Sequence, residues 1–153
     1  MIRFRSERRL VIRLISALAL LPLLLVACGS PEPLVFDGEV AYEHVTEQCD
    51  IGFRPTGSEA GWATGDYIIS QLEAQGWTVE TEEFTYRDTP VRNIVGRAGE
   101  GPILILGAHY DTRRSADQED PTVPVMGATD GGSGVAVLLE LAPVLDPGRL
   151  QHE

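Results

Sequence analysis

The chain contains no lysine, so all 12 of its basic residues are arginines. Its most glycine-rich segment, residues 131–134, lacks both the Gly-x-Gly-x-x-Gly order of dinucleotide sites and the lysine of a Walker phosphate loop. Beyond residues 1–27, only 7 arginines face 22 acidic residues, which gives a net charge of −15. A chain so acidic repels nucleic acid and anionic membrane surfaces, and the sequence therefore predicts no nucleic-acid partner.

A long membrane-spanning run is also absent. The uncharged stretch at residues 14–27 has 14 residues, short of the roughly 20 that a transmembrane helix needs. Four arginines in residues 1–9 precede this stretch and small residues follow it. This order is typical of a secretory signal peptide, with a short transmembrane anchor as the alternative.

The end of the apolar run carries a recognisable tetrapeptide. Residues 25–28, Leu-Val-Ala-Cys, resemble the lipobox of bacterial lipoproteins. The resemblance implies cleavage before Cys28 and acyl chains on its sulfur and new amino group, which together anchor stably where one chain does not. Ordinary secretion with an incidental cysteine is the alternative. We therefore expect an extracytoplasmic protein, lipid-anchored to the bacterial cell membrane or envelope.

Only two cysteines are present. If Cys28 carries lipid, Cys49 has no partner and no internal disulfide forms. Cys49 follows apolar residues at helical spacing, which predicts a buried small hydrophobic residue rather than a nucleophile. The expected organisation is a signal peptide at 1–27, a proline-containing tether at 28–38, and a folded domain at 39–153.

Hydrophobic periodicity predicts an α/β fold. Helices are expected at 39–50, 59–75 and 135–145, and strands at 77–86, 91–98 and 102–108. A change in alternation predicts a β-bulge near Glu82 and Glu83. The run Ile-Leu-Ile-Leu predicts that the third strand is buried on both faces. Pro143 predicts a kink or an early helix end near Ala142, and Glu140 is expected to be solvated or salt-bridged.

Three polar residues stand at expected strand and loop ends, where α/β sheets build sites. His109 follows the third strand, Asp111 comes two residues later, and Asp130 lies on a glycine-rich turn before a helix. Alone, they are typical of a loop residue, a turn former and a helix N-cap. Together they predict the start of a zinc site, with His109 as ligand, Asp111 orienting it, and Asp130 as a carboxylate able to bridge two cations. His44 and His152 receive no role.

In combination, the chain resembles the secreted zinc aminopeptidases that share a fold with glutaminyl cyclases. The segments that carry the resemblance are residues 54–58, 76–84, 93–95, 107–112 and 127–142. It implies a three-layer α/β fold whose mixed, mostly parallel sheet is flanked by helices. It also implies that His109 binds zinc, that Asp111 orients His109, and that Asp130 bridges two zincs in a peptidase or binds one in a cyclase. A cis peptide is implied between Asp130 and Gly131.

The chain departs from this family in its ligand count. The family uses further ligands and a Glu-Glu pair as base and ligand, beyond the helix that follows Asp130. Residues 151–153, Gln-His-Glu, do not match that pair in spacing or context. We therefore expect the truncated N-terminal portion of a longer enzyme, with an incomplete fold, no general base, and no activity by itself.

Three functions remain open. The first is an aminopeptidase that acts on peptide substrates with two zincs, favoured by the peptidase-like turn at residues 131–134. The second is a glutaminyl-peptide cyclotransferase with one zinc, favoured by Trp77 after Gly76 and by residues 112–118. The third is a non-catalytic anchored lipoprotein on a degenerate peptidase scaffold.

Overall fold

The computed structural model describes residues 35–116, 120 and 122–145 of the chain. The expected signal peptide, Cys28, most of the tether, and His152 lie outside these residues. None of the helices formed by the described residues combines the length and apolar character needed to cross a membrane.

Two helices form where hydrophobic periodicity predicts them. Helix α2 spans Gly38–Ile51, and the Asp37 carboxylate accepts hydrogen bonds from the first backbone amides of the helix. Helix α3 spans Glu59–Ala74, and the Ser58 hydroxyl accepts from the Gly61 amide at 3.0 Å. These side chains satisfy amides that have no partner within the helix, so the local sequence sets where each helix begins.

Helix α4 spans Ser133–Val144 and includes Pro143. The predicted kink or end near Ala142 is wrong, because the helix continues for two more residues. Pro143 lies in the last turn, where its missing N–H removes one hydrogen bond from the end of the helix. The Leu145 amide then donates to the Leu141 carbonyl at 2.9 Å and closes that turn.

The described sheet is an antiparallel hairpin of β1 (Thr78–Tyr86) and β2 (Thr89–Arg97). Its pairing runs without interruption from Thr78 opposite Arg97 to Tyr86 opposite Thr89, so the predicted bulge near Glu82 is wrong. Every residue of β1 except Val79 is exposed. Without a buried face, alternation along the strand carries no information on register. The change in apolar and polar alternation near Glu82 therefore occurs on an exposed strand and does not mark a bulge.

The predicted third strand is absent, because residues 103–111 form no regular pairing with any described segment. Ile103, Leu104 and Ile105 are 87%, 78% and 83% exposed, which also overturns their predicted burial. A strand exists only with a partner for its backbone groups. Parallel pairing among the described residues is confined to one bridge between Pro55 and Thr112, so they do not show the expected mostly parallel sheet.

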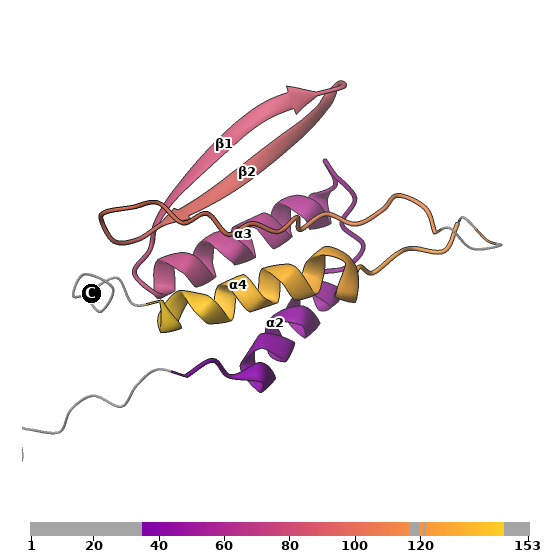
Figure 1. The fold of residues 1–153 in the computed structure, drawn as a ribbon. Coiled ribbons are helices and arrows are strands. Elements are labelled where there is room, and N and C mark those ends of the chain that lie inside the picture. The colour runs from indigo at the N-terminus through magenta and orange to yellow at the C-terminus, as the bar shows by residue number, and fades with distance from the viewer. Residues whose placement is uncertain (1–34, 117–119, 121, 146–153) are drawn as a thin grey trace, which may run out of the picture. The chain divides into compact units, whose positions relative to one another are not determined.

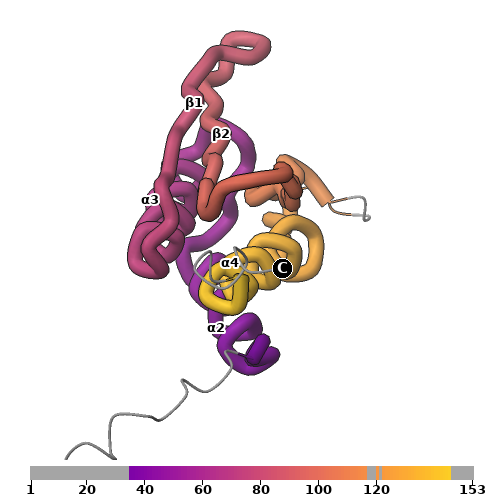
Figure 2. The backbone as a smooth tube through the Cα atoms, turned by 60° about the vertical axis from the view of Figure 1, so that its left-hand side comes forward, coloured from indigo at the N-terminus to yellow at the C-terminus, as the bar shows by residue number. Residues whose placement is uncertain are grey.

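The hydrophobic core lies between α3 and α4. Ile68 of α3 packs with Val135 and Leu139 of α4, and Tyr67, Leu72, Ile94 and Tyr110 pack around them. The hairpin lies along α3, α4 lies beside α3, and α2 packs on α4 (Figure 1). The far end of the hairpin extends past the helices (Figure 2). The core therefore fixes α4, whose first residues follow directly on the glycine-rich turn.

Two predicted environments differ from those observed. Glu140 is buried rather than solvated, and its carboxylate accepts a hydrogen bond from the Asp37 amide at 3.0 Å, which ties α4 to the start of α2. Cys49 is half-buried rather than buried. His44 on α2 contacts the Tyr67 hydroxyl of α3 at 2.6 Å. Burial lowers the pKa of His44 and raises the pKa of Tyr67.

Candidate metal centre

The structure brings the three predicted site residues together. His109 Nδ1 lies 3.2 Å from Asp111 Oδ1, and His109 Nε2 lies 3.1 Å from Asp130 Oδ1. The three side chains are 58%, 43% and 58% exposed, so the group is open to solvent. One imidazole thus stands between two carboxylates from separate segments of the chain.

The hydrogen on the imidazole can be placed from its neighbours. His109 Nδ1 lies 3.2 Å from both the carboxylate and the backbone carbonyl of Asp111, which are both acceptors. With its hydrogen on Nδ1, the imidazole donates to Asp111 and leaves Nε2 to face the Asp130 carboxylate. Nε2 and the Asp130 oxygen are then two electron-pair donors 3.1 Å apart, an arrangement that one cation between them would make favourable.

Asp111 is held by a second contact. Its Oδ2 accepts a hydrogen bond from the Thr56 hydroxyl at 2.6 Å, while Oδ1 faces His109. Both carboxylate oxygens therefore have partners, and the plane of the group is fixed. A carboxylate held in this way fixes the tautomer and ring orientation of the histidine that it contacts.

Asp130 lies in the turn Ala128–Gly132 (η1), which leads directly into α4. Gly131 has φ 88°, in the left-handed region, and a Cβ there would lie 3.0 Å from His109 Cε1. Glycine is therefore required by both backbone conformation and close approach. The N-cap of α4 is Gly132 with no side-chain cap, so the simpler reading of Asp130 as an N-cap is wrong.

The expected cis peptide between Asp130 and Gly131 is also absent, since the described residues contain no cis bond. The chain turns instead with Asp130 at φ −86°, ψ 103° and Gly131 at φ 88°, ψ −56°. The Gly132 amide donates to the Gly127 carbonyl at 3.0 Å, which closes the turn.

Sequence reasoning missed the residue that joins these segments. This residue is Arg54, whose side chain is fully buried and donates to four backbone carbonyls. The acceptors are the carbonyls of Gln48, Tyr110, Met126 and Gly127. No spacing rule identifies such a residue, because its partners are far apart in the sequence.

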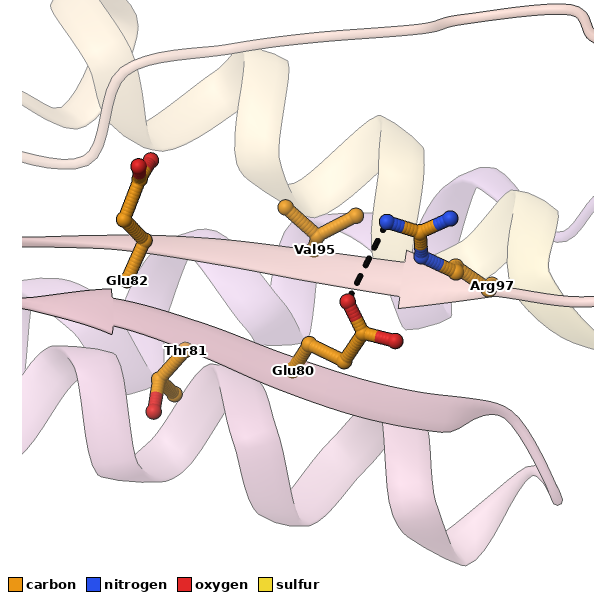
Figure 3. Close-up of a pocket in the computed structure, with 5 residues that line it drawn as sticks. All are labelled: Glu80, Thr81, Glu82, Val95 and Arg97. Carbon is orange, nitrogen blue, oxygen red and sulfur yellow. Dashed lines mark ion pairs between the residues drawn. The ribbon is translucent and has the colours of Figure 1, made fainter.

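Among the described residues no group of three or more His, Cys, Asp or Glu side chains could hold a metal ion. His109 and Asp130 therefore make at most part of a site. A hollow elsewhere, on the hairpin, is lined by Glu80, Thr81, Glu82, Val95 and Arg97, and a 3.1 Å ion pair joins Glu80 to Arg97 (Figure 3). It contains none of the predicted site residues.

Replacing Gly132 by alanine is expected to lower the free energy of unfolding by about 1–3 kcal/mol, as overpacking does. Its Cβ would lie 2.7 Å from the Gly127 carbonyl oxygen and 3.1 Å from Arg54 Nη2, and the first of these is backbone that cannot move aside cheaply. Urea unfolding followed by circular dichroism measures the change. Gly38→Ala, with nothing within 4 Å of the new Cβ, is the control and should stay within about 0.5 kcal/mol. Equal effects of the two substitutions would contradict the prediction.

Comparisons with known proteins show the family and the fold that this chain is similar to. The family model described as Peptidase family M28 matches residues 91–153. A solved glutaminyl cyclase from Fimbriiglobus ruber is 27% identical with a TM-score of 0.64, covering 78% of this chain and 43% of its own. A leucine aminopeptidase precursor from Bacteroides thetaiotaomicron is 35% identical with a TM-score of 0.59, covering 72% and 42%.

Two further proteins are similar to this chain. A zinc-dependent exopeptidase from Parabacteroides distasonis is 34% identical with a TM-score of 0.58, covering 71% of this chain and 41% of its own. The protein YfbL of Escherichia coli is 38% identical over 84 residues, which are 54% of this chain and 26% of YfbL. The chain thus spans about two fifths of the solved structures. Residues 91–153 match peptidase family M28, and the described elements form part of the α/β fold shared by zinc-dependent exopeptidases and glutaminyl cyclases.

Proposed function

We propose that the protein to which these residues belong is a zinc-dependent aminopeptidase, with His109 and Asp130 as zinc ligands. The contact between His109 Nε2 and Asp130 Oδ1 at 3.1 Å carries the proposal, because it brings an imidazole nitrogen and a carboxylate oxygen from separate segments within reach of one cation. Two ligand atoms bound to one tetrahedral zinc lie roughly 3.3 Å apart. The observed separation therefore fits a shared metal, and imidazole nitrogen with carboxylate oxygen is a donor set that zinc accepts.

Each residue has a separate role in this proposal. Bound zinc would polarise the scissile carbonyl and supply a nucleophilic water near neutral pH. Asp111 keeps the hydrogen of His109 on Nδ1, so that Nε2 stays available as a ligand, and Thr56 holds Asp111 in place. The general base and the remaining ligands are proposed to come from polypeptide outside the described residues. Two zincs are expected in a peptidase and one in a cyclase.

Hydrolysis of an aminoacyl-p-nitroanilide by the purified, zinc-loaded complete protein tests this function. We expect release of nitroaniline that stops when a chelator removes the metal and returns when zinc is added. The 153-residue chain alone is expected to be inactive and to bind zinc weakly. Tight, stoichiometric zinc in this chain, measured by metal analysis after dialysis, would contradict the proposal that ligands are missing.

Glutaminyl cyclase is the second candidate, favoured by the TM-score of 0.64 to the Fimbriiglobus ruber enzyme. A cyclase would release ammonia from a peptide with an N-terminal glutamine and leave the nitroanilide intact. An aminopeptidase would cleave the nitroanilide and release no ammonia from the glutamine peptide. Turnover of neither substrate with zinc bound would favour a non-catalytic lipoprotein on the same scaffold.

We also propose that the protein lies outside the cytoplasm, anchored by lipid on Cys28. Replacing Cys28 by serine is expected to abolish incorporation of labelled palmitate and to move the protein from the membrane fraction to the soluble fraction, because the acylated sulfur is lost. Cys49→Ser is the matched control and should leave labelling unchanged. Labelling that persists in the Cys28 variant would rule out this anchor.

A further inference from the structure

We infer that Arg54 is a positioning residue that sets the separation between His109 and Asp130. The inference rests on the proposed zinc site and adds to it a residue that touches neither metal nor substrate. Its basis is that one fully buried side chain contacts the backbone on both sides of the candidate centre.

The first set of contacts holds the segment that carries His109. Arg54 Nε donates to the Tyr110 carbonyl at 2.9 Å, and Tyr110 lies between His109 and Asp111 in the chain. The backbone of Arg54 adds to this, since its carbonyl accepts from the Thr112 amide at 3.1 Å. The neighbouring Pro55 forms the parallel bridge with Thr112. Residues 110–112 are thus fixed to Arg54 by backbone and side chain together.

The second set of contacts holds the turn that carries Asp130. Arg54 Nη1 donates to the Met126 carbonyl at 2.7 Å, and Nη2 donates to the Gly127 carbonyl at 2.9 Å. The Gly127 carbonyl also accepts from the Gly132 amide, which closes the turn around Asp130. One guanidinium therefore contacts the two segments whose side chains meet at 3.1 Å.

Gln48 of α2 provides a second support for the turn. It is fully buried, its Nε2 donates to the Gly132 carbonyl at 3.0 Å, and its own carbonyl accepts from Arg54 Nη1 at 3.2 Å. The turn is therefore held at one end by Arg54 and at the other by Gln48. Both anchors belong to parts of the fold that precede the candidate ligands in the chain.

The chemistry of this position calls for arginine. A guanidinium offers five N–H donors in a rigid plane, and here they reach four carbonyls on separate segments. A lysine ammonium has three donors on a single atom, so it cannot reach acceptors spread across that plane. Burial lowers the pKa of Arg54 while nearby Cys49 and Asp111 raise it. The buried guanidinium is hydrogen-bonded to backbone carbonyls through all three of its nitrogens.

Arg92 provides a matched comparison. Its side chain is 8% exposed, and it bonds Asp66 at 2.8 Å and the Trp62 carbonyl at 2.9 Å. It joins β2 to α3 and its side chain contacts neither candidate ligand. Arg92 also bonds Tyr110 in the His109 segment, so Arg92→Lys removes buried hydrogen bonds beside that segment but leaves every contact of the Asp130 turn in place.

The test compares the complete protein with its Arg54→Lys, Gln48→Met and Arg92→Lys variants. In the metal-free state, nuclear Overhauser contacts between the His109 Cε1 proton and the Gly131 α-protons report the approach of the two segments. Cobalt(II) titration, followed by visible absorption, reports the metal site. We expect Arg54→Lys to lose the Overhauser contact and to weaken cobalt binding by about 10- to 100-fold, as loss of supporting contacts does at metal sites. Arg92→Lys should keep the Overhauser contact and the cobalt affinity, even though its thermal stability is equal to or lower than that of Arg54→Lys.

Gln48→Met decides the result if Arg54→Lys does not fold, because it removes one support and keeps the side-chain volume. We expect a weaker Overhauser contact and a smaller loss of cobalt affinity. An unchanged Overhauser contact in the folded Arg54→Lys chain, or in Gln48→Met if that chain alone folds, overturns the inference. Absence of cobalt binding in the parent complete protein instead counts against the proposed zinc ligands, and the metal-free Overhauser contact still decides the role of Arg54.

Discussion

Replacing His109 by alanine in the complete protein is expected to reduce kcat/KM for an aminoacyl-p-nitroanilide by roughly a thousandfold or more. Loss of the imidazole removes a proposed ligand, and metal polarisation contributes several kcal/mol of barrier lowering at about 1.4 kcal/mol for each tenfold in rate. Asp130→Asn should act similarly, since it removes the carboxylate charge and keeps the shape. Steady-state kinetics and zinc content, measured on the same preparations, check both effects.

Two substitutions serve as controls for these changes. His44→Gln removes a histidine that contacts Tyr67 between α2 and α3, and Asp120→Asn removes an exposed carboxylate whose partner is Thr122. Both should retain near-parental kcat/KM. Asp111→Asn should lower kcat/KM by about 10- to 100-fold, which is less than the loss in the His109 and Asp130 variants. The reason is that Asp111 orients a ligand and is not itself a ligand. Near-parental activity of both the His109 and Asp130 variants would refute the ligand assignment.

The elements that the sequence predicts well are those set by local signals. Helices α2 and α3 begin after Asp37 and Ser58, whose side chains accept bonds from the first amides of each helix. The meeting of His109 with Asp111 is also local, because two residues separate them. Its meeting with Asp130 depends on the fold, and the resemblance to zinc aminopeptidases, rather than a local signal, implies it.

Features that depend on distant partners were missed. The run Ile-Leu-Ile-Leu after β2 has the composition of a buried strand, but no described segment pairs with it and it stays exposed. Arginine is a residue type usually found at the surface. The Arg54 side chain is nevertheless buried, and backbone carbonyls from three separate segments surround it. Whether the run forms a strand, and whether Arg54 is buried, both depend on backbone groups elsewhere in the chain. Residue type and periodicity do not predict where those groups lie.

Truncating Leu139 to alanine is expected to lower the free energy of unfolding by about 2–5 kcal/mol, the sum of lost apolar burial and a residual cavity. Leu139 is 4% exposed, and among the buried hydrophobic residues of the described chain only Ile68, Val135 and Leu139 are larger than alanine. Urea unfolding monitored by tryptophan fluorescence measures the change.

Val137→Ala is the matched control on the same helix, because Val137 is 43% exposed. It should cost less than about 1 kcal/mol, and equal losses at both positions would show that the α3–α4 core does not limit stability.

The consequence of the Leu139 change extends to the candidate centre. Tyr110 packs against this core, its hydroxyl donates to the Arg92 carbonyl at 2.9 Å, and its own carbonyl accepts from Arg54. Loosening the core therefore loosens the residue between His109 and Asp111, so metal affinity should fall together with stability in Leu139→Ala but not in Val137→Ala.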